Sequence, residues 1–102
     1  MGDRIITNKK GGRQSYIGVA YDCLDPVAME KLAEVLYQGF IKYGADNWRL
    51  IPCVSHLNHA LAHIMKFLMG DKSEDHLEHA FCRLMMAVAM KHRPRYRGRL
   101  SK

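Results

Sequence analysis

The chain has 102 residues, 48% of them hydrophobic, which is enough for one small domain with a modest core but too little for two. Three cysteines without a CxxC pair argue against a disulfide framework or a zinc knuckle and favour a reducing, cytoplasmic setting. The net charge of +6 comes from the two ends, since nine of the ten acids lie in residues 22–78, which predicts phosphate-bearing partners or, as the alternative, solubilising tails.

Residues 1–24 are predicted to form an irregular N-terminal arm. They are largely polar, with two glycines in the middle, and only residues 16–21 have the composition of a short extended piece. The first helix is expected to start at Pro26 with Asp25 as its cap, because Asp is a preferred N-cap and Pro fits the first helical position. It should run to Tyr43, since Gly44 is a natural C-terminal stop.

Two further helices are predicted after a loop that holds the only tryptophan. Ser55 is expected to cap the second helix, which should end at Gly70. Ser73 or Asp75 is expected to cap the third helix, which should run to about Lys91. The order of these elements, with little strand signal, predicts helix packed on helix.

The predicted fold class is all-α, a small helical bundle with an irregular N-terminal arm and a basic C-terminal tail. The helical domain is expected to span residues 25–91 and the tail residues 92–102. The tail interleaves arginine with tyrosine and glycine, as nucleic-acid-binding tails often do. Its candidate contacts with nucleic acid are Arg93, Arg95, Arg97 and Arg99.

Five of the six histidines lie within 24 residues, on the two later helices: His56, His59, His63, His76 and His79. At about 100° per residue, each helix places its histidines on one face, far from its own main apolar positions. The histidines therefore either line solvated outer faces or meet across the bundle or a subunit interface. If they meet, the expected result is a metal site, because histidine is the commonest metal ligand.

The first helix offers two carboxylates to such a site, Glu30 and Glu34, at positions i and i+4. A mixed set of imidazoles and carboxylates suits Mn, Fe, Co, Ni or Zn better than Mg, which prefers oxygen ligands. A cation held there would bind phosphate oxygens and lower the pKa of a bound water. Glu30 or Glu34 would then serve as a ligand or as the catalytic base that orients the water.

A compact block at the end of the first helix combines phosphate donors, flat rings and a base-reading amide. Its candidate substrate-binding residues are Lys42, Tyr43, Asn47, Trp48 and Arg49. Rings stack on nucleobases, and Lys or Arg neutralises phosphate, so the block predicts a nucleotide site. A second interpretation, compatible with the first, is a helix C-cap whose Tyr and Trp fill the core.

The same block resembles part of a known family. Residues 36–44, LYQGFIKYG, and residues 47–49, NWR, are similar to the YGAxKYGxxNWR segment of the phage-associated dATP/dGTP diphosphohydrolase N-terminal-like family. The family's Arg-His-Leu stretch, which ends in Gly-Glu or Gly-Asp, is matched by Ala-His-Ile at 62–64 and Gly-Asp at 70–71. Its HLxHA motif is matched by residues 76–80, and the order and spacing agree over most of the chain.

The resemblance implies an all-α enzyme that cleaves a purine deoxynucleoside triphosphate to the monophosphate and pyrophosphate. It implies a divalent metal as cofactor (Mn, Mg or another transition metal) and a location in the cytoplasm, that of the host cell if a phage encodes the chain. A homo-oligomer is expected because the titratable stripes need covering. No membrane partner is expected, because no apolar run approaches the roughly 18 residues of a span. The metal-site residues implied by the resemblance are Glu34, His63, Asp75, His76 and His79.

The sequence departs from the family pattern at two positions of interest, with Ala62 in place of an arginine and Arg83 in place of an asparagine. The alternative function is non-enzymatic: a phage accessory protein that binds or sequesters a nucleotide, or that binds nucleic acid through the tail. Because His56 and His59 have no match in the family pattern, they are interpreted as solvated bystanders.

Overall fold

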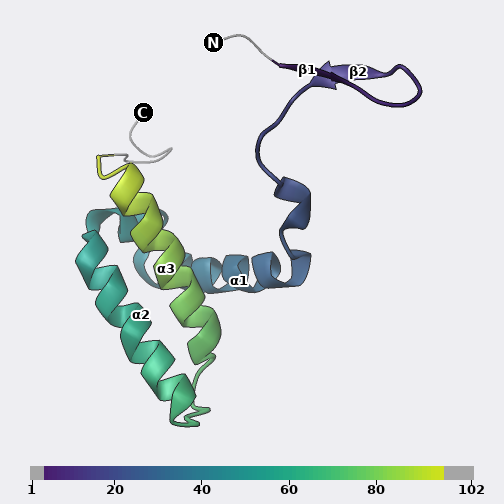
Figure 1. Cartoon of the computed structure of the whole chain (residues 1–102). Helices are drawn as coiled ribbons and strands as arrows, with labels where there is room; N and C mark the ends of the chain where they lie inside the picture. Colours follow the sequence, from purple (N-terminus) through teal and green to yellow (C-terminus); the bar gives the residue numbers. More distant parts are fainter. Residues whose placement is uncertain (1–3, 96–102) are drawn as a thin grey trace.

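The structure is a computed structural model, and it describes residues 4–95. Its two strands and two 3-10 turns are β1 (Ile5–Thr7), β2 (Arg13–Ser15), η1 (Tyr21–Cys23) and η2 (Asn47–Leu50). Its α-helices are α1 (Pro26–Tyr43), α2 (Cys53–Leu68) and α3 (His76–His92). The described chain is therefore mostly helical, as predicted, with a small two-stranded sheet near its N-terminus (Figure 1).

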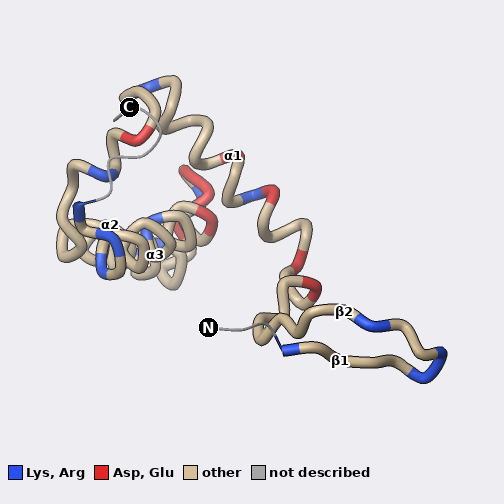
Figure 2. The backbone as a smooth tube through the Cα atoms, turned by 90° about the horizontal axis from the view of Figure 1, so that it is seen from above, with Lys and Arg blue, Asp and Glu red and all other residues tan. Residues whose placement is uncertain are grey.

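The prediction of an irregular arm was wrong over residues 5–15, and residues 16–21, expected to be a short extended piece, form no strand. The strands β1 and β2 pair antiparallel, with Ile6 opposite Gln14. The turn between them is stabilised by the Asn8 side chain, whose Oδ1 accepts hydrogen bonds from the backbone amides of Lys10 (3.0 Å) and Gly12 (2.8 Å). This hairpin projects away from the helices, and its basic residues stand out in Figure 2.

Helix α1 follows the predicted capping. The Asp25 side chain accepts a hydrogen bond from the Ala28 amide at 2.8 Å, and Pro26 occupies the first turn. Gly44 ends the helix with φ of +94°, a conformation that costs glycine little. Both bounds of this helix agree with the sequence.

The other two helices differ in how well their starts were predicted. Helix α2 begins at Cys53, with Pro52 and not Ser55 at the N-cap. Helix α3 begins at His76 with Asp75 at the N-cap, one of the two predicted positions. Gly70, with φ of +81°, turns the chain between them, so that α2 and α3 run antiparallel and α1 crosses α3 (Figure 1).

The histidines of α2 and α3 do not all lie on solvated outer faces. His56 is 0% exposed and His76 is 2% exposed, so the interpretation of His56 as a solvated bystander was wrong. Both lie on inner faces whose other buried members are small, Ala60 and Ala80 among them. Small residues let the two helices approach closely enough for imidazoles to meet between them.

The larger apolar side chains of α2 and α3, such as Leu61 and Leu77, are exposed. Sequence periodicity had placed them in the core, and the structure places them on the surface. Among the described residues, no helix has both the length and the hydropathy of a bilayer span.

Candidate functional site

A groove of about 1020 Å³ runs between the C-terminal half of α1, the η2 turn and one side of α3. All five residues of the predicted substrate-binding block line it: Lys42, Tyr43, Asn47, Trp48 and Arg49. The groove is also lined by Glu74 and His79, which belong to the α2–α3 hairpin. The crossing of α1 over α3 thus brings the aromatic and basic block to the same hollow as part of the histidine set.

The η2 side of the groove is held by contacts among three neighbouring side chains. Arg49 Nε lies 3.3 Å from Asp46 Oδ1, and its guanidinium sits 4.2 Å from the centre of the Trp48 ring. Asp46 adopts a left-handed conformation with φ of +63°, which aims its side chain back over the turn. Its second carboxylate oxygen is buried and has no hydrogen-bond partner among the described residues.

His56 holds this turn against the helical hairpin. Its Nε2–H donates to the Trp48 carbonyl oxygen at 2.9 Å, and its Nδ1 accepts from the Arg83 guanidinium at 3.2 Å. The two bonds fix one neutral tautomer of a fully buried ring. Arg83, which departs from the family pattern, is thereby the residue that satisfies His56.

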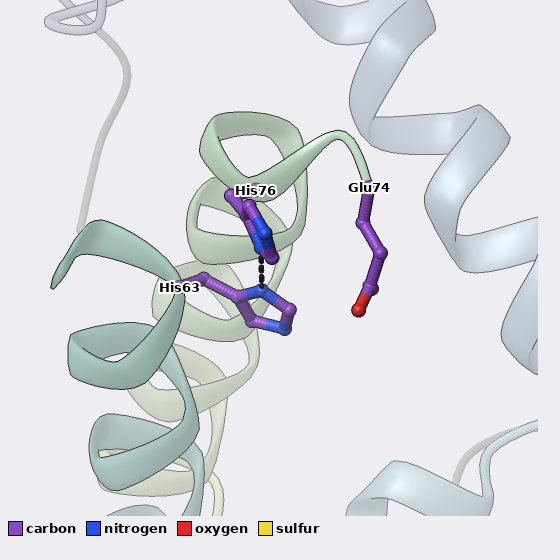
Figure 3. Close-up of side chains that lie close together, drawn as sticks. All are labelled: His63, Glu74 and His76. Carbon is purple, nitrogen blue, oxygen red and sulfur yellow. Dashed lines mark hydrogen bonds between the residues drawn. The ribbon is translucent and has the colours of Figure 1, made fainter. Parts of the chain in front are cut away.

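Three other histidines converge between α2 and α3. His63 Nδ1 and His76 Nδ1 are 2.9 Å apart, and the His79 ring stacks on His63 with 5.1 Å between ring centres. Donor atoms of His63, Glu74 and His76 all lie within 4.8 Å of one another. Figure 3 shows Glu74 reaching from the loop before α3 toward the same side of the two imidazoles. We call these four residues (His63, Glu74, His76 and His79) the imidazole cluster.

Asp71 orients the buried member of this cluster. Asp71 Oδ1 lies 3.4 Å from His76 Nε2, and the carboxylate also accepts bonds from the Ser73 amide and hydroxyl at 2.8 and 2.6 Å. The two hydrogen bonds from Ser73, and to a smaller extent the contact with His76, lower the pKa of Asp71 to about 2. The carboxylate is therefore ionised near neutral pH. An ionised Asp71 keeps the proton of His76 on Nε2 and leaves its Nδ1 lone pair facing His63.

The pKa of His63 is lowered, first by burial and then by the neighbouring His79. Burial also lowers the pKa of His56, against the opposing effect of its bond to Trp48, and Arg83 lowers it further. Both rings are therefore neutral at pH 7, and neutral imidazole is the form that binds a metal ion.

The unfolded chain should bind more protons than the folded one just below pH 6.5, the ordinary pKa of histidine. Stability present above pH 6.5 should therefore be lost as the pH falls toward the depressed pKa values of His56 and His63. Urea denaturation at pH 7.5, 6.5 and 5.5 should show a falling free energy of unfolding. A His92→Ala variant, which removes an exposed ring that does not act on His56 or His63, should keep the same slope. An unfolding free energy that is flat or rises between pH 7.5 and 5.5 would contradict the argument.

The predicted carboxylates lie elsewhere. Glu30 and Glu34 line a shallow hollow on the exposed side of α1, where Glu34 Oε1 is 3.4 Å from Lys31 Nζ. This hollow adjoins the groove, since Tyr37 and Gln38 line both. Asp75 is exposed at the N-cap of α3, and Glu74, its neighbour, is the carboxylate that joins the imidazoles.

Sequence reasoning missed Asp71, Glu74 and Arg83 as members of the site. An Asp followed by a Ser two residues later, directly after a helix-ending glycine, is the pattern that would have indicated the Asp71 turn. The predicted tail contacts Arg93 and Arg95 are exposed, and Arg97 and Arg99 lie outside the described residues.

The imidazole cluster has the chemistry of a site for a transition metal. The Nδ1 atoms of His63 and His76 lie 2.9 Å apart, a hydrogen-bond distance, whereas two ligands about 2.1 Å from a tetrahedral cation lie roughly 3.4 Å apart. A bound ion would therefore replace the proton between the rings and separate them by about 0.5 Å. His76 Nε2 is buried, and the Asp71 carboxylate at 3.4 Å is placed to accept its hydrogen, which leaves Nδ1 as the nitrogen that would bind the ion. Asp71 is thus placed as the outer partner of a metal-bound histidine is.

Comparison with known proteins gives one family. Residues 8–98 match the family model described as dATP/dGTP diphosphohydrolase, N-terminal. No curated protein and no solved structure gives a significant match. The family match spans both the groove-lining block and the imidazole cluster.

Proposed function

The chain belongs to the dATP/dGTP diphosphohydrolase N-terminal family, and from this we propose that it hydrolyses a purine deoxynucleoside triphosphate to the monophosphate and pyrophosphate with a divalent metal, in the cytoplasm. The observation that carries the proposal is the shared groove. Glu74 and His79 belong to the imidazole cluster and line the same hollow as Lys42, Tyr43 and Trp48. A ligand in the groove would therefore contact both groups of residues.

The base and the phosphates have distinct partners in this groove. Tyr43 and Trp48 offer ring faces for stacking on a purine, which is worth about 1–3 kcal/mol per base. Lys42 provides a cation for the phosphates, and Arg49, held by Asp46 and Trp48, places a second positive charge in the groove.

The imidazole cluster would hold the metal through His63, His76 and Glu74, with His79 stacked beside them. A bound divalent ion there would neutralise phosphate charge and acidify a water molecule. The water oxygen would bond to the α-phosphorus while the bond to the bridging oxygen of pyrophosphate breaks. The proton released by the water would pass to a carboxylate; Glu74 is the carboxylate that lies beside the imidazoles, whereas Glu34, the base expected from the sequence, lines the adjoining hollow.

The test is incubation of the purified chain with dATP or dGTP and Mn²⁺ or Mg²⁺, with pyrophosphate as the readout. We expect turnover that falls at least about 100-fold in a His63→Ala, His79→Ala double variant, since both the cation and the acidified water are lost. The matched control is His92→Ala, which removes an imidazole that is exposed and belongs neither to the cluster nor to the groove lining. Wild-type turnover no greater than that of the double variant would exclude hydrolysis, and nucleotide binding without turnover would favour the sequestering alternative.

A further inference from the structure

The helical hairpin α2–α3 carries a large apolar surface that no other part of residues 4–95 covers. Its members repeat with the same 4-3-4 spacing on both helices, which is the spacing of a and d positions in a heptad. Seven of the eight are between 36% and 72% exposed, and the eighth, Ile64, is half-buried. We call this set the leucine face: Leu57, Leu61, Ile64 and Leu68 on α2, and Leu77, Phe81, Leu84 and Val88 on α3.

The two rows of the leucine face lie on one side of the hairpin. At about 100° per residue, each row is displaced by roughly 100° in the same rotational sense from the inner face of its own helix. Because α2 and α3 run antiparallel (Figure 1), equal displacements bring the rows to the same side. The groove uses the other side of α3, through Cys82, Met86 and Ala89. The leucine face and the groove therefore point in opposite directions.

The size of the uncovered surface is that of an interface. The chain exposes 8573 Å², against roughly 5900 Å² expected for a compact monomer of its mass. Its radius of gyration is 18.0 Å, against about 13 Å expected. The β1–β2 hairpin, which projects from the helices, accounts for part of the excess surface area and of the excess radius of gyration. A stable dimer, however, buries only about 800 Å² per partner. Two rows of large side chains on adjacent helices supply an area of that order.

The chemistry of the face fits a second copy of itself. The rows contain no charged residue, and α2 as a whole carries one, Lys66. Two such faces would therefore meet without like-charge repulsion. A row with 4-3-4 spacing packs best against another row of the same spacing, because each side chain then enters a gap between four others. The chain supplies two such rows already antiparallel, which is half of a four-helix bundle.

We propose that two copies of the chain join through their leucine faces to form an antiparallel four-helix bundle, with the two grooves facing outward. The proposal is independent of the function proposed above, since no residue of the groove or of the imidazole cluster takes part. It predicts that the purified full chain sediments at twice the mass of one chain, 11.7 kDa, at micromolar concentrations.

Sedimentation of interface variants tests the proposal. Leu84→Glu would bury a carboxylate in the centre of the bundle and should leave a one-chain mass at 50 µM. The matched control is Leu50→Glu, which places the same charge at an apolar side chain that is 82% exposed and outside the leucine face. The control should keep the wild-type mass. Circular dichroism checks that each variant is helical.

A milder variant keeps the test decisive if Leu84→Glu fails to fold. Leu84→Ala removes the contact without adding charge and should raise the dissociation constant at least tenfold. A wild-type chain that is helical and has a one-chain mass at 100 µM would overturn the proposal. So would a dimer whose dissociation constant rises in Leu50→Glu and stays unchanged in Leu84→Ala, because the interface would then lie elsewhere.

Discussion

A His63→Ala variant should bind Zn²⁺ or Mn²⁺ at least about 100-fold more weakly than the wild-type chain. The reason is that His63 supplies one of the ligand atoms that lie within 4.8 Å of one another, and removal of a ligand costs more than the 10- to 100-fold typical of an outer partner. The measurement is isothermal titration of the purified, metal-free chain at pH 7.5. His63 is half-buried, so its truncation should leave the helices intact.

Two further variants test whether the imidazole cluster is the metal site. Asp71→Asn should weaken binding by 10- to 100-fold, because the amide no longer fixes the proton of His76 on Nε2. His59→Ala should bind as the wild type does, since its ring is exposed and outside the cluster. Equal affinities of His63→Ala and His59→Ala would show that the cluster is not the metal site.

A His56→Ala variant should lose about 3 kcal/mol of its free energy of unfolding. The change removes two hydrogen bonds, each worth about 1 kcal/mol, and leaves the Trp48 carbonyl and the Arg83 guanidinium without a partner in a buried place. It also leaves a cavity at a position that is fully buried. A loss of this size is a large part of the 5–15 kcal/mol that holds a typical domain together.

Urea denaturation at one fixed protein concentration measures this loss, because self-association would make the midpoint depend on concentration. His59→Ala is the matched control, one helical turn away on the same helix, and should change the unfolding free energy by less than about 0.5 kcal/mol. If His56→Ala and His59→Ala differ by less than that amount, the buried contacts of His56 do not stabilise the fold.

The parts of the fold that depend on local chemistry were predictable from the sequence. The Asp25 cap and the Gly44 stop fixed both bounds of α1, because each acts within one turn of the helix. The turn of the N-terminal hairpin was missed, since it depends on the side chain of Asn8 folding back onto two amides. Composition alone, polar with two glycines, does not distinguish such a turn from an irregular loop.

The sequence identified many residues of the candidate site but not how they are arranged in space. The block from Lys42 to Arg49 and the pair His76 and His79 were identified, but their meeting depends on how α1 crosses α3, which no local pattern encodes. The orientation of α2 and α3 was the main error. Hydrophobic periodicity assigns the largest apolar row to the core, whereas the buried residues of α2 and α3 are three alanines, two histidines, Cys82 and Met90.

The alanines between α2 and α3 set the distance between the imidazoles without touching any ligand of the site. Ala60 lies one helical turn before His63, and Ala80 one turn after His76, and both are almost completely buried. A larger side chain at either position would push the helix axes apart and pull His63 away from His76. An exchange of either alanine for glycine or serine would therefore change the distance between the imidazole nitrogens, and with it the preferred ion, while every histidine stays in place.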